Sequence, residues 1–172
     1  MEALLEKDIK EAIKNTSLSH IAIIMDGNRR WAKQRNLPSL KGHQKGFENI
    51  RDLAPYIFDR GVEVLSVYAF SEQNFNRSVE EVGYLMDLFI KEFKKEYKKL
   101  HEENIKIVFS SRESLLRDDV REAMNEIVEL TKNNTRGIFN ICLSYSGQQE
   151  VCEMTKKICE LYKNGEVELD DI

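Results

Sequence analysis

The sequence predicts an α/β fold: an open, mainly parallel sheet with helices on both faces. Short segments rich in apolar and β-branched residues alternate with longer stretches of helical periodicity along the chain. This alternation is typical of parallel strands joined by right-handed crossover helices. Polar clusters follow three of the expected strands, and in open parallel sheets ligands bind outside the carboxyl ends of the strands. The pattern therefore predicts both a fold and the edge of the sheet that carries a site.

The composition is that of a folded domain without a nucleic-acid signal. The chain has 172 residues, of which 41% are hydrophobic, and this is enough for a core. Asp and Glu number 30 and Lys and Arg number 26, so the net charge is -4 and no basic excess points to nucleic acid. We expect an N-terminal amphipathic helix over residues 1–18 and one α/β domain over residues 19–172.

The cysteines and the apolar runs predict a cytoplasmic protein. Cys142, Cys152 and Cys159 are odd in number and lie late in the chain, which disfavours a disulfide framework and favours a reducing compartment. No apolar run approaches the roughly 20 residues that span a bilayer. Residues 1–17 also lack the apolar stretch of a signal peptide.

The N-terminal segment has the pattern of a short amphipathic helix. Its apolar side chains fall on one helical face, and they are Leu5, Ile9, Ala12 and Ile13. Such a face usually packs against the protein's own core. Packing on a partner, or peripheral contact with a membrane, are the alternatives that the pattern leaves open.

The first expected strand leads into a turn suited to binding anions. Residues 21–25 form an apolar run without alternation, which favours a strand covered on both faces. Gly27 permits a sharp turn, and Asn28 is a good N-cap for a helix that begins at Arg29 and ends near residue 36. Free N–H groups at a helix start, together with arginine side chains, attract anions.

Asp26 adds a carboxylate to this basic turn. It would repel an anion unless a divalent ion lay between them, and Mg²⁺ is a hard ion that prefers oxygen ligands. The stretch therefore predicts a magnesium diphosphate site. The alternative is that Asp26 and Gly27 only end the strand and that Arg29 and Arg30 are solvated.

The remaining elements continue the alternation. Helices are expected over residues 42–60, 79–103, 118–132 and 149–163, and strands over residues 62–70, 105–109 and 137–144. Ser78 and Glu81 form a capping box at the start of the second of these helices. Residues 71–78, between the second strand and that helix, form a polar loop.

Three motifs carry a family resemblance: HIAIIMDGNRRWA at residues 20–32, GHQKG at residues 42–46, and YAFSEQNFNRS at residues 68–78, followed by Glu81. In this order and spacing they resemble the cis-prenyltransferases, typified by undecaprenyl diphosphate synthase. The resemblance runs from residue 20 to about residue 172. It implies condensation of isopentenyl diphosphate with an allylic diphosphate, such as farnesyl or geranyl diphosphate, with Mg²⁺ as the cofactor and a new cis double bond in the product.

The resemblance also implies roles for individual residues. Asp26 matches the aspartate that holds the metal and assists loss of the diphosphate, and Asn74 matches the asparagine assigned to proton removal. Substrate binding is implied for Gly27, Asn28, Arg29, Arg30, Trp31, His43, Ser71, Glu72, Gln73, Phe75 and Arg77. Taken alone, His43 could make a structural hydrogen bond, and Asn74 and Arg77 could be turn residues. The GHxxG pattern after DGNRRW favours ligand contact by His43. The place of the loop at the ligand-binding edge of the sheet favours a role in binding for Asn74 and Arg77.

Apolar residues of the long helix and of the second strand are candidates for a hydrophobic channel that holds the growing isoprenoid. These candidates are Ala69, Leu85, Leu88 and Phe89. Ala69 is small and lies near the end of its strand, where it leaves room. The alternative for each of the others is ordinary core packing.

Several positions depart from the family pattern. Ser39 replaces the usual arginine, Gln73 the glutamate and Phe75 the tryptophan. Ser78 replaces the usual proline, Ser146 a glycine and Gln148 an arginine. The replacement at Ser39 removes an expected diphosphate ligand. Glu72 could partly substitute for the glutamate that Gln73 replaces.

The family's C-terminal portion has no counterpart in these 172 residues. That portion holds a further strand, the arginine and serine residues that bind isopentenyl diphosphate, and a second metal-binding glutamate. We expect a second, unlike prenyltransferase-like chain to supply it in a heterodimer. A homodimer is the other assembly that we consider. The alternative is a degenerate homologue that binds an allylic diphosphate as a regulator. A phosphohydrolase with Asp26 as nucleophile is less favoured, because no second aspartate follows two residues later and no GxxxxGK motif is present.

Overall fold

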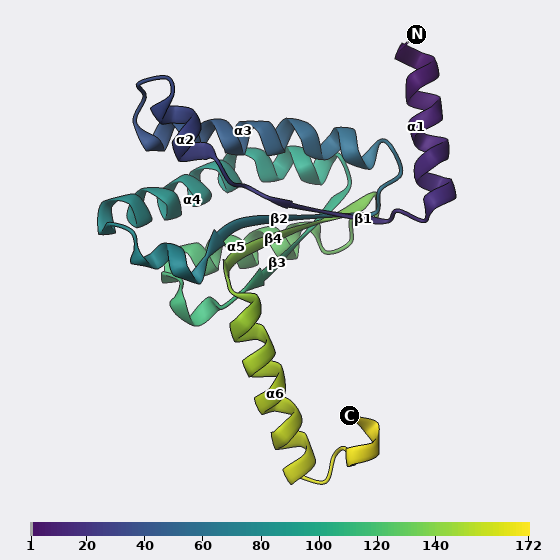
Figure 1. The fold of residues 1–172 in the computed structure, drawn as a ribbon, viewed down its shortest axis with the longest axis vertical. Helices are drawn as coiled ribbons and strands as arrows, with labels where there is room; N and C mark the ends of the chain where they lie inside the picture. The colour runs from purple at the N-terminus through teal and green to yellow at the C-terminus, as the bar shows by residue number, and fades with distance from the viewer. Residues whose placement is uncertain (1) are drawn as a thin grey trace.

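Four parallel strands form one sheet in the order β1-β2-β4-β3 (Figure 1). The computed structural model describes residues 2–172, with side chains at residues 8–92, 95 and 98–172. The strands are β1 (His20–Ile24), β2 (Val64–Ser71), β3 (Ile105–Ser111) and β4 (Gly137–Tyr145). All three strand pairs are parallel, so the predicted α/β class with a parallel sheet and helices is confirmed.

Helices precede, connect and follow the strands. They are α1 (Glu2–Thr16), α2 (Asn28–Lys33), α3 (Ser39–Phe58), α4 (Val79–Glu102), α5 (Asp118–Thr131) and α6 (Gly147–Lys163). Three short 3₁₀ helices complete the fold: η1 (Glu72–Asn76), η2 (Glu113–Leu115) and η3 (Leu169–Asp171). In Figure 1, α1 and α6 extend away from the body made by the sheet and α3 to α5, and the C-terminus lies at the short helix η3 that follows α6.

The core lies between one face of the sheet and the helices α3, α4 and α5. Alternate residues of the central strands β2 and β4 are buried on this face, including Leu65, Val67, Phe139 and Ile141. The side chains of Ile50, Ala54, Ile57, Phe58, Leu85, Met86, Val120, Met124 and Ile127 meet them from the helices. The opposite face of β2 and β4 is only partly covered, since Tyr68 and Cys142 are half-buried.

Strand β1 lies at the edge of the sheet, and this corrects the expectation that residues 21–25 form a strand buried on both faces. Its residues alternate between exposed and half-buried, and Ile24 is 75% exposed. The strand also begins one residue earlier than expected, at His20. A local apolar run cannot reveal strand order, because the order depends on pairing between distant segments. As a result, the turn that carries Asp26 leaves the sheet from its rim.

The turn after β1 is built on Gly27 and not on an Asn28 cap. Gly27 has φ of +86°, in the left-handed region that favours glycine, and α2 begins directly at Asn28. The side-chain amide of Asn28 donates to the carbonyl oxygen of Met25 at 3.3 Å, so it ties the turn to the end of the strand. Helix α2 ends at Lys33, earlier than expected, and α3 begins at Ser39 immediately after Pro38.

The N-terminal helix is present over Glu2–Thr16. The side chain of Leu5, one residue of the predicted apolar face, lies outside the described residues. Ile13, on the same face, is half-buried and packs against the core. Among the residues that the structure describes, no helix combines the length and apolar content needed to cross a bilayer.

Candidate functional site

A cavity of about 250 Å³ opens at the carboxyl ends of β1 and β2 and continues beneath the sheet between α3 and α4. The predicted site residues that line it are Asp26, Asn28, His43, Ser71, Asn74 and Arg77. All four predicted channel residues line it as well: Ala69, Leu85, Leu88 and Phe89. Toward the middle of the sheet its walls are apolar, with Ile107, Phe139 and Ile141. The cavity therefore combines a polar mouth with an apolar interior.

Asp26 lies at the exposed rim of this mouth. One carboxylate oxygen accepts a hydrogen bond from the Gly27 N–H at 2.6 Å, and the other lies 2.8 Å from Nη2 of Arg30. The side chains of Asp26 and Arg30 are 77% and 76% exposed. An ion pair this exposed contributes about 0–1 kcal/mol, so little free energy is needed to break it.

The two glycines of the GHQKG motif provide the space that Asn28 occupies. A Cβ added at Gly42 would overlap the backbone carbonyl of Asn28, and one added at Gly46 would overlap its side-chain amide. Helices α2 and α3 therefore pack in close contact at this point. The motif positions the turn that follows β1, a role that its spacing alone did not reveal.

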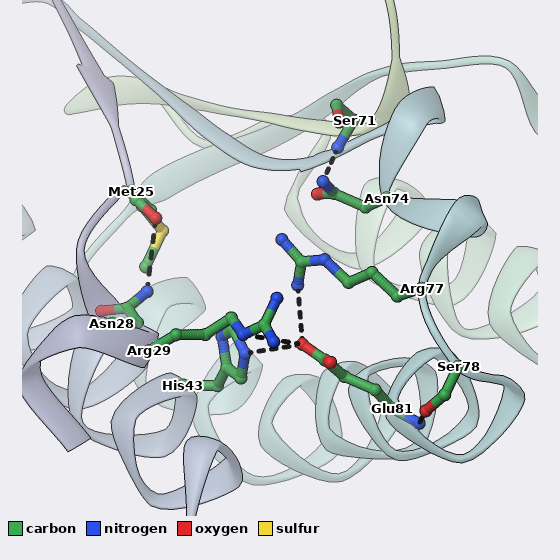
Figure 2. Close-up of polar contacts among 9 residues, drawn as sticks. All are labelled: Met25, Asn28, Arg29, His43, Ser71, Asn74, Arg77, Ser78 and Glu81. Carbon is green, nitrogen blue, oxygen red and sulfur yellow. Dashed lines mark hydrogen bonds and ion pairs between the residues drawn. The ribbon is translucent and has the colours of Figure 1, made fainter. Parts of the chain in front are cut away.

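Glu81, at the start of α4, connects the basic residues of the mouth (Figure 2). Its Oε1 atom accepts a hydrogen bond from Arg77 Nη1 at 3.1 Å and lies 3.3 Å from His43 Nε2. Nε of Arg29 lies 3.9 Å from the same oxygen. The sequence placed Glu81 in the third motif and in a capping box, but it did not predict these contacts. The nearest signal in the sequence was the four-residue spacing from Arg77, although Arg77 lies before α4 in an extended conformation.

The protonation of His43 follows from its surroundings. Burial lowers the pKa of the His43 imidazole below its ordinary 6.5, and this outweighs the hydrogen bond that the ring donates to Glu81, which raises the pKa. The positive charges of Arg77 and Arg29 lower the pKa further, whereas the charge of Glu81 raises it. At pH 7 the ring is therefore a neutral hydrogen-bond donor to Glu81.

We expect an NMR titration of the His43 ring to give a pKa below 6.5. Since the unfolded chain then binds this proton more tightly, the contribution of His43 to stability is present above pH 6.5 and is lost as the pH falls through the folded-state pKa. The signals can be assigned with a His43→Gln variant. A titration midpoint above 6.5 would contradict the geometry described here.

The loop after β2 presents Asn74 to the cavity. The backbone N–H of Ser71 donates to Oδ1 of Asn74 at 3.1 Å, which holds the short helix η1 against the end of the strand. Arg77 follows at the C-terminus of η1, and its N–H donates to the Asn74 carbonyl oxygen at 3.1 Å. The loop is therefore folded so that Asn74 and Arg77 face the same space.

Several predicted site residues lie outside the cavity wall. Arg30 pairs with Asp26, and Arg29 reaches Glu81 from the outer side. The indole of Trp31 lies under the guanidinium of Arg35, 4.4 Å from the ring centroid. Gln73 is exposed, Phe75 packs edge-on against Phe70, and Glu72 pairs with Arg112 at a neighbouring surface pocket. Their role in substrate binding stays a prediction.

The donor set around Asp26 determines which metal it could hold. Among the described residues, no three His, Cys, Asp or Glu side chains gather as a metal site. A metal that needs several protein ligands therefore does not fit this carboxylate. Mg²⁺ does fit, because it usually keeps several waters and takes only one or two protein carboxylates together with substrate phosphates.

Comparisons with known proteins agree with the motifs. The family model Prenyltransf, described as "Putative undecaprenyl diphosphate synthase", matches residues 24–171. The chain is 40% identical over 172 residues to the ditrans,polycis-undecaprenyl-diphosphate synthase of Micrococcus luteus, specific for (2E,6E)-farnesyl diphosphate. It is also 40% identical over 170 residues to the tritrans,polycis-undecaprenyl-diphosphate synthase of Methanocaldococcus jannaschii, specific for geranylgeranyl diphosphate.

These alignments cover 95% and 97% of this chain but only 68% and 61% of the two relatives. The fold is shared with lavandulyl diphosphate synthase from Lavandula x intermedia, solved in complex with dimethylallyl diphosphate. That match has a TM-score of 0.87 and 31% identity, and it covers 90% of this chain and 66% of the plant enzyme. The chain therefore belongs to the family of undecaprenyl diphosphate synthases, the cis-prenyltransferases.

Proposed function

We propose that these residues form the allylic-diphosphate half of a Mg²⁺-dependent cis-prenyltransferase. The complete enzyme would condense isopentenyl diphosphate with an allylic diphosphate to give a cis-polyprenyl diphosphate. One observation carries this proposal: polar side chains from the turn after β1, from α2, from α3 and from η1 converge on the mouth of an otherwise apolar cavity. An allylic diphosphate has the matching form, with a charged head and a hydrocarbon tail.

The charged head would bind at the mouth. Arg77 and Asn28 line the mouth, and Arg30 lies beside Asp26 at its rim. The two guanidinium groups suit phosphate oxygens. Asp26 would hold Mg²⁺ against the diphosphate, and the metal would neutralise charge on the leaving group as the allylic C–O bond breaks. Arg77 should matter more in the transition state than in the ground state, because negative charge on the diphosphate grows during this step.

The hydrocarbon tail would occupy the interior of the cavity. Leu85, Leu88 and Phe89 face it from α4, and Ala69 leaves room beside the end of β2. Burying an isoprenoid there is favourable by roughly 25 cal/mol for each Å² of apolar surface removed from water. Asn74 lines the same cavity, and we propose for it the role in proton removal that the resemblance implies.

Binding of isopentenyl diphosphate requires residues beyond these. The curated relatives are longer than this chain, so we propose that further polypeptide completes the site, and we favour a second prenyltransferase-like chain. Exposed apolar side chains support an assembled form: Ile24 on the edge strand, and Val151 and Met154 on α6.

The test is incorporation of labelled isopentenyl diphosphate into polyprenyl product in the presence of Mg²⁺ and farnesyl diphosphate. We expect incorporation once a chain carrying the isopentenyl-binding residues is added, and little or none by the 172 residues alone. Binding of farnesyl diphosphate without incorporation under either condition would favour the regulator. Release of phosphate without incorporation would favour a hydrolase.

A further inference from the structure

Three basic side chains meet at a single carboxylate oxygen at the mouth of the cavity (Figure 2). Oε1 of Glu81 lies 3.1 Å from Arg77, 3.3 Å from His43 and 3.9 Å from Arg29. Glu81 belongs to α4, and its three partners belong to the end of η1, to α3 and to α2. The Glu81 carboxylate therefore connects four elements. The N-terminal cap of α4 does not require this carboxylate, because the cap is made by the Glu81 backbone N–H and Ser78 Oγ.

The Glu81 side chain is largely buried, and its backbone is fixed by the cap of α4. Its side chain is 15% exposed and that of His43 is 11% exposed, so their contact is largely shielded from water. The Glu81 backbone N–H donates to Ser78 Oγ at 3.2 Å and fixes the first turn of α4. Electrostatic contacts that are shielded from water are stronger than those at the open surface.

We propose that Glu81 is a positioning residue that holds the Arg77 guanidinium and the His43 ring ready for the diphosphate. The inference rests on the proposed function. An arginine side chain has five N–H donors, and the contact with Glu81 uses those of Nη1. The rest of the guanidinium in Figure 2 points toward the space between Asn28 and Asn74. Glu81 therefore orders the long Arg77 side chain before the ligand arrives.

The physical gain is in conformational entropy. A free arginine samples many rotamers, and ordering it during binding costs affinity. Glu81 also carries a negative charge, which opposes binding of an anion. These two effects have opposite signs, so a test must separate the hydrogen bonds from the charge.

The substitutions Glu81→Gln and Glu81→Ala make this separation. Both remove the same charge, but glutamine keeps the length of the side chain and an oxygen that accepts a hydrogen bond from Arg77. Their difference therefore reports the positioning alone. Glu80→Gln and Glu80→Ala are matched controls, because Glu80 is the neighbouring exposed carboxylate on the same helix turn and does not line the cavity.

The measurement is the Kd for inorganic diphosphate and for farnesyl diphosphate, by calorimetry with Mg²⁺ present. We expect the Kd of E81A to exceed that of E81Q by about fivefold to tenfold for both ligands, as ordering one long side chain would give. We expect no difference between E80A and E80Q. As a second readout, the His43 ring should titrate at lower pH in E81Q than in the wild type, since the carboxylate that raises its pKa is gone.

Each outcome decides between the alternatives. Equal affinities of E81A and E81Q, in a wild type that binds both ligands, would overturn the positioning role and leave the proposed function standing. An unchanged His43 titration in folded E81Q would also overturn it, and this holds even if E81A fails to fold. A wild type that binds neither ligand would refute the proposed function, and the role of Glu81 would fall with it.

Discussion

Substituting Asp26 by alanine should lower the rate of isopentenyl incorporation by about 10²- to 10³-fold, the size of effect seen when one group that stabilises transition-state charge is removed. Asp26 is the only Asp or Glu among the described residues that line the cavity, and it pairs with Arg30 of the basic turn. Without it, Mg²⁺ would lose its protein ligand at the diphosphate. The affinity for farnesyl diphosphate should then no longer increase when Mg²⁺ is added.

The same substitution should leave the fold intact. Asp26 and Arg30 form an exposed ion pair, and such pairs contribute about 0–1 kcal/mol to stability. Asp52→Ala is the matched control, because Asp52 is an exposed aspartate paired with Arg51 on α3 and lies outside the cavity wall. Incorporation assays and calorimetry with and without Mg²⁺ check both points. An Asp26→Ala protein as active as the Asp52→Ala protein would refute the assigned role.

Substituting Gly42 by alanine should destabilise the chain by about 1–3 kcal/mol, the usual cost of overpacking a tight contact. An added Cβ would overlap the carbonyl oxygen of Asn28, and it would lie 2.8 Å from the carbonyl carbon and 3.1 Å from the Ala32 Cβ. Most of these atoms belong to the backbone of α2, which cannot move aside without shifting the turn. Urea denaturation with an unchanged m-value measures the loss.

Gly83→Ala is the control, because it makes the same glycine-to-alanine change in a helix at a position without a close contact. Gly83 also lies inside a helix, α4, but a Cβ there would meet no atom within 4 Å. Alanine is favoured over glycine in a helix interior, so Gly83→Ala should stabilise the protein by about 0.5–1 kcal/mol. If both glycine substitutions stabilised the chain, α2 and α3 would not pack as closely as described.

The order of the elements and the location of the site were predictable from the sequence. The alternation of strands and helices, and the polar clusters after residues 25, 70 and 144, depend on local periodicity and on the general rule for open parallel sheets. The four proposed channel residues line the cavity because their helical and strand spacing places them on the inner face. Whether they bind an isoprenoid stays a prediction.

Features that depend on long-range pairing could not be predicted in this way. The apolar run before Asp26 reads as a buried strand, yet strand order places it at the edge. Asn28 has the residue type of an N-cap, but the left-handed conformation of Gly27 starts the helix one residue earlier. Glu81 reads as a helix cap, whereas its partner His43 lies 38 residues away in the sequence. A distant contact determined the outcome for the strand and for Glu81, whereas the neighbouring Gly27 determined it for Asn28.

The close contact between Asn28 and the glycines of α3 has a consequence for ligand recognition. Because Gly42 and Gly46 lie so close to Asn28 that a Cβ at either position would overlap it, we expect the turn from Gly27 onward to be held in place before any ligand arrives. The entropy cost of ordering this turn is then met when the chain folds, so it does not reduce the affinity for a diphosphate. Substitutions that loosen this helix pair should therefore weaken anion capture even when the protein remains folded.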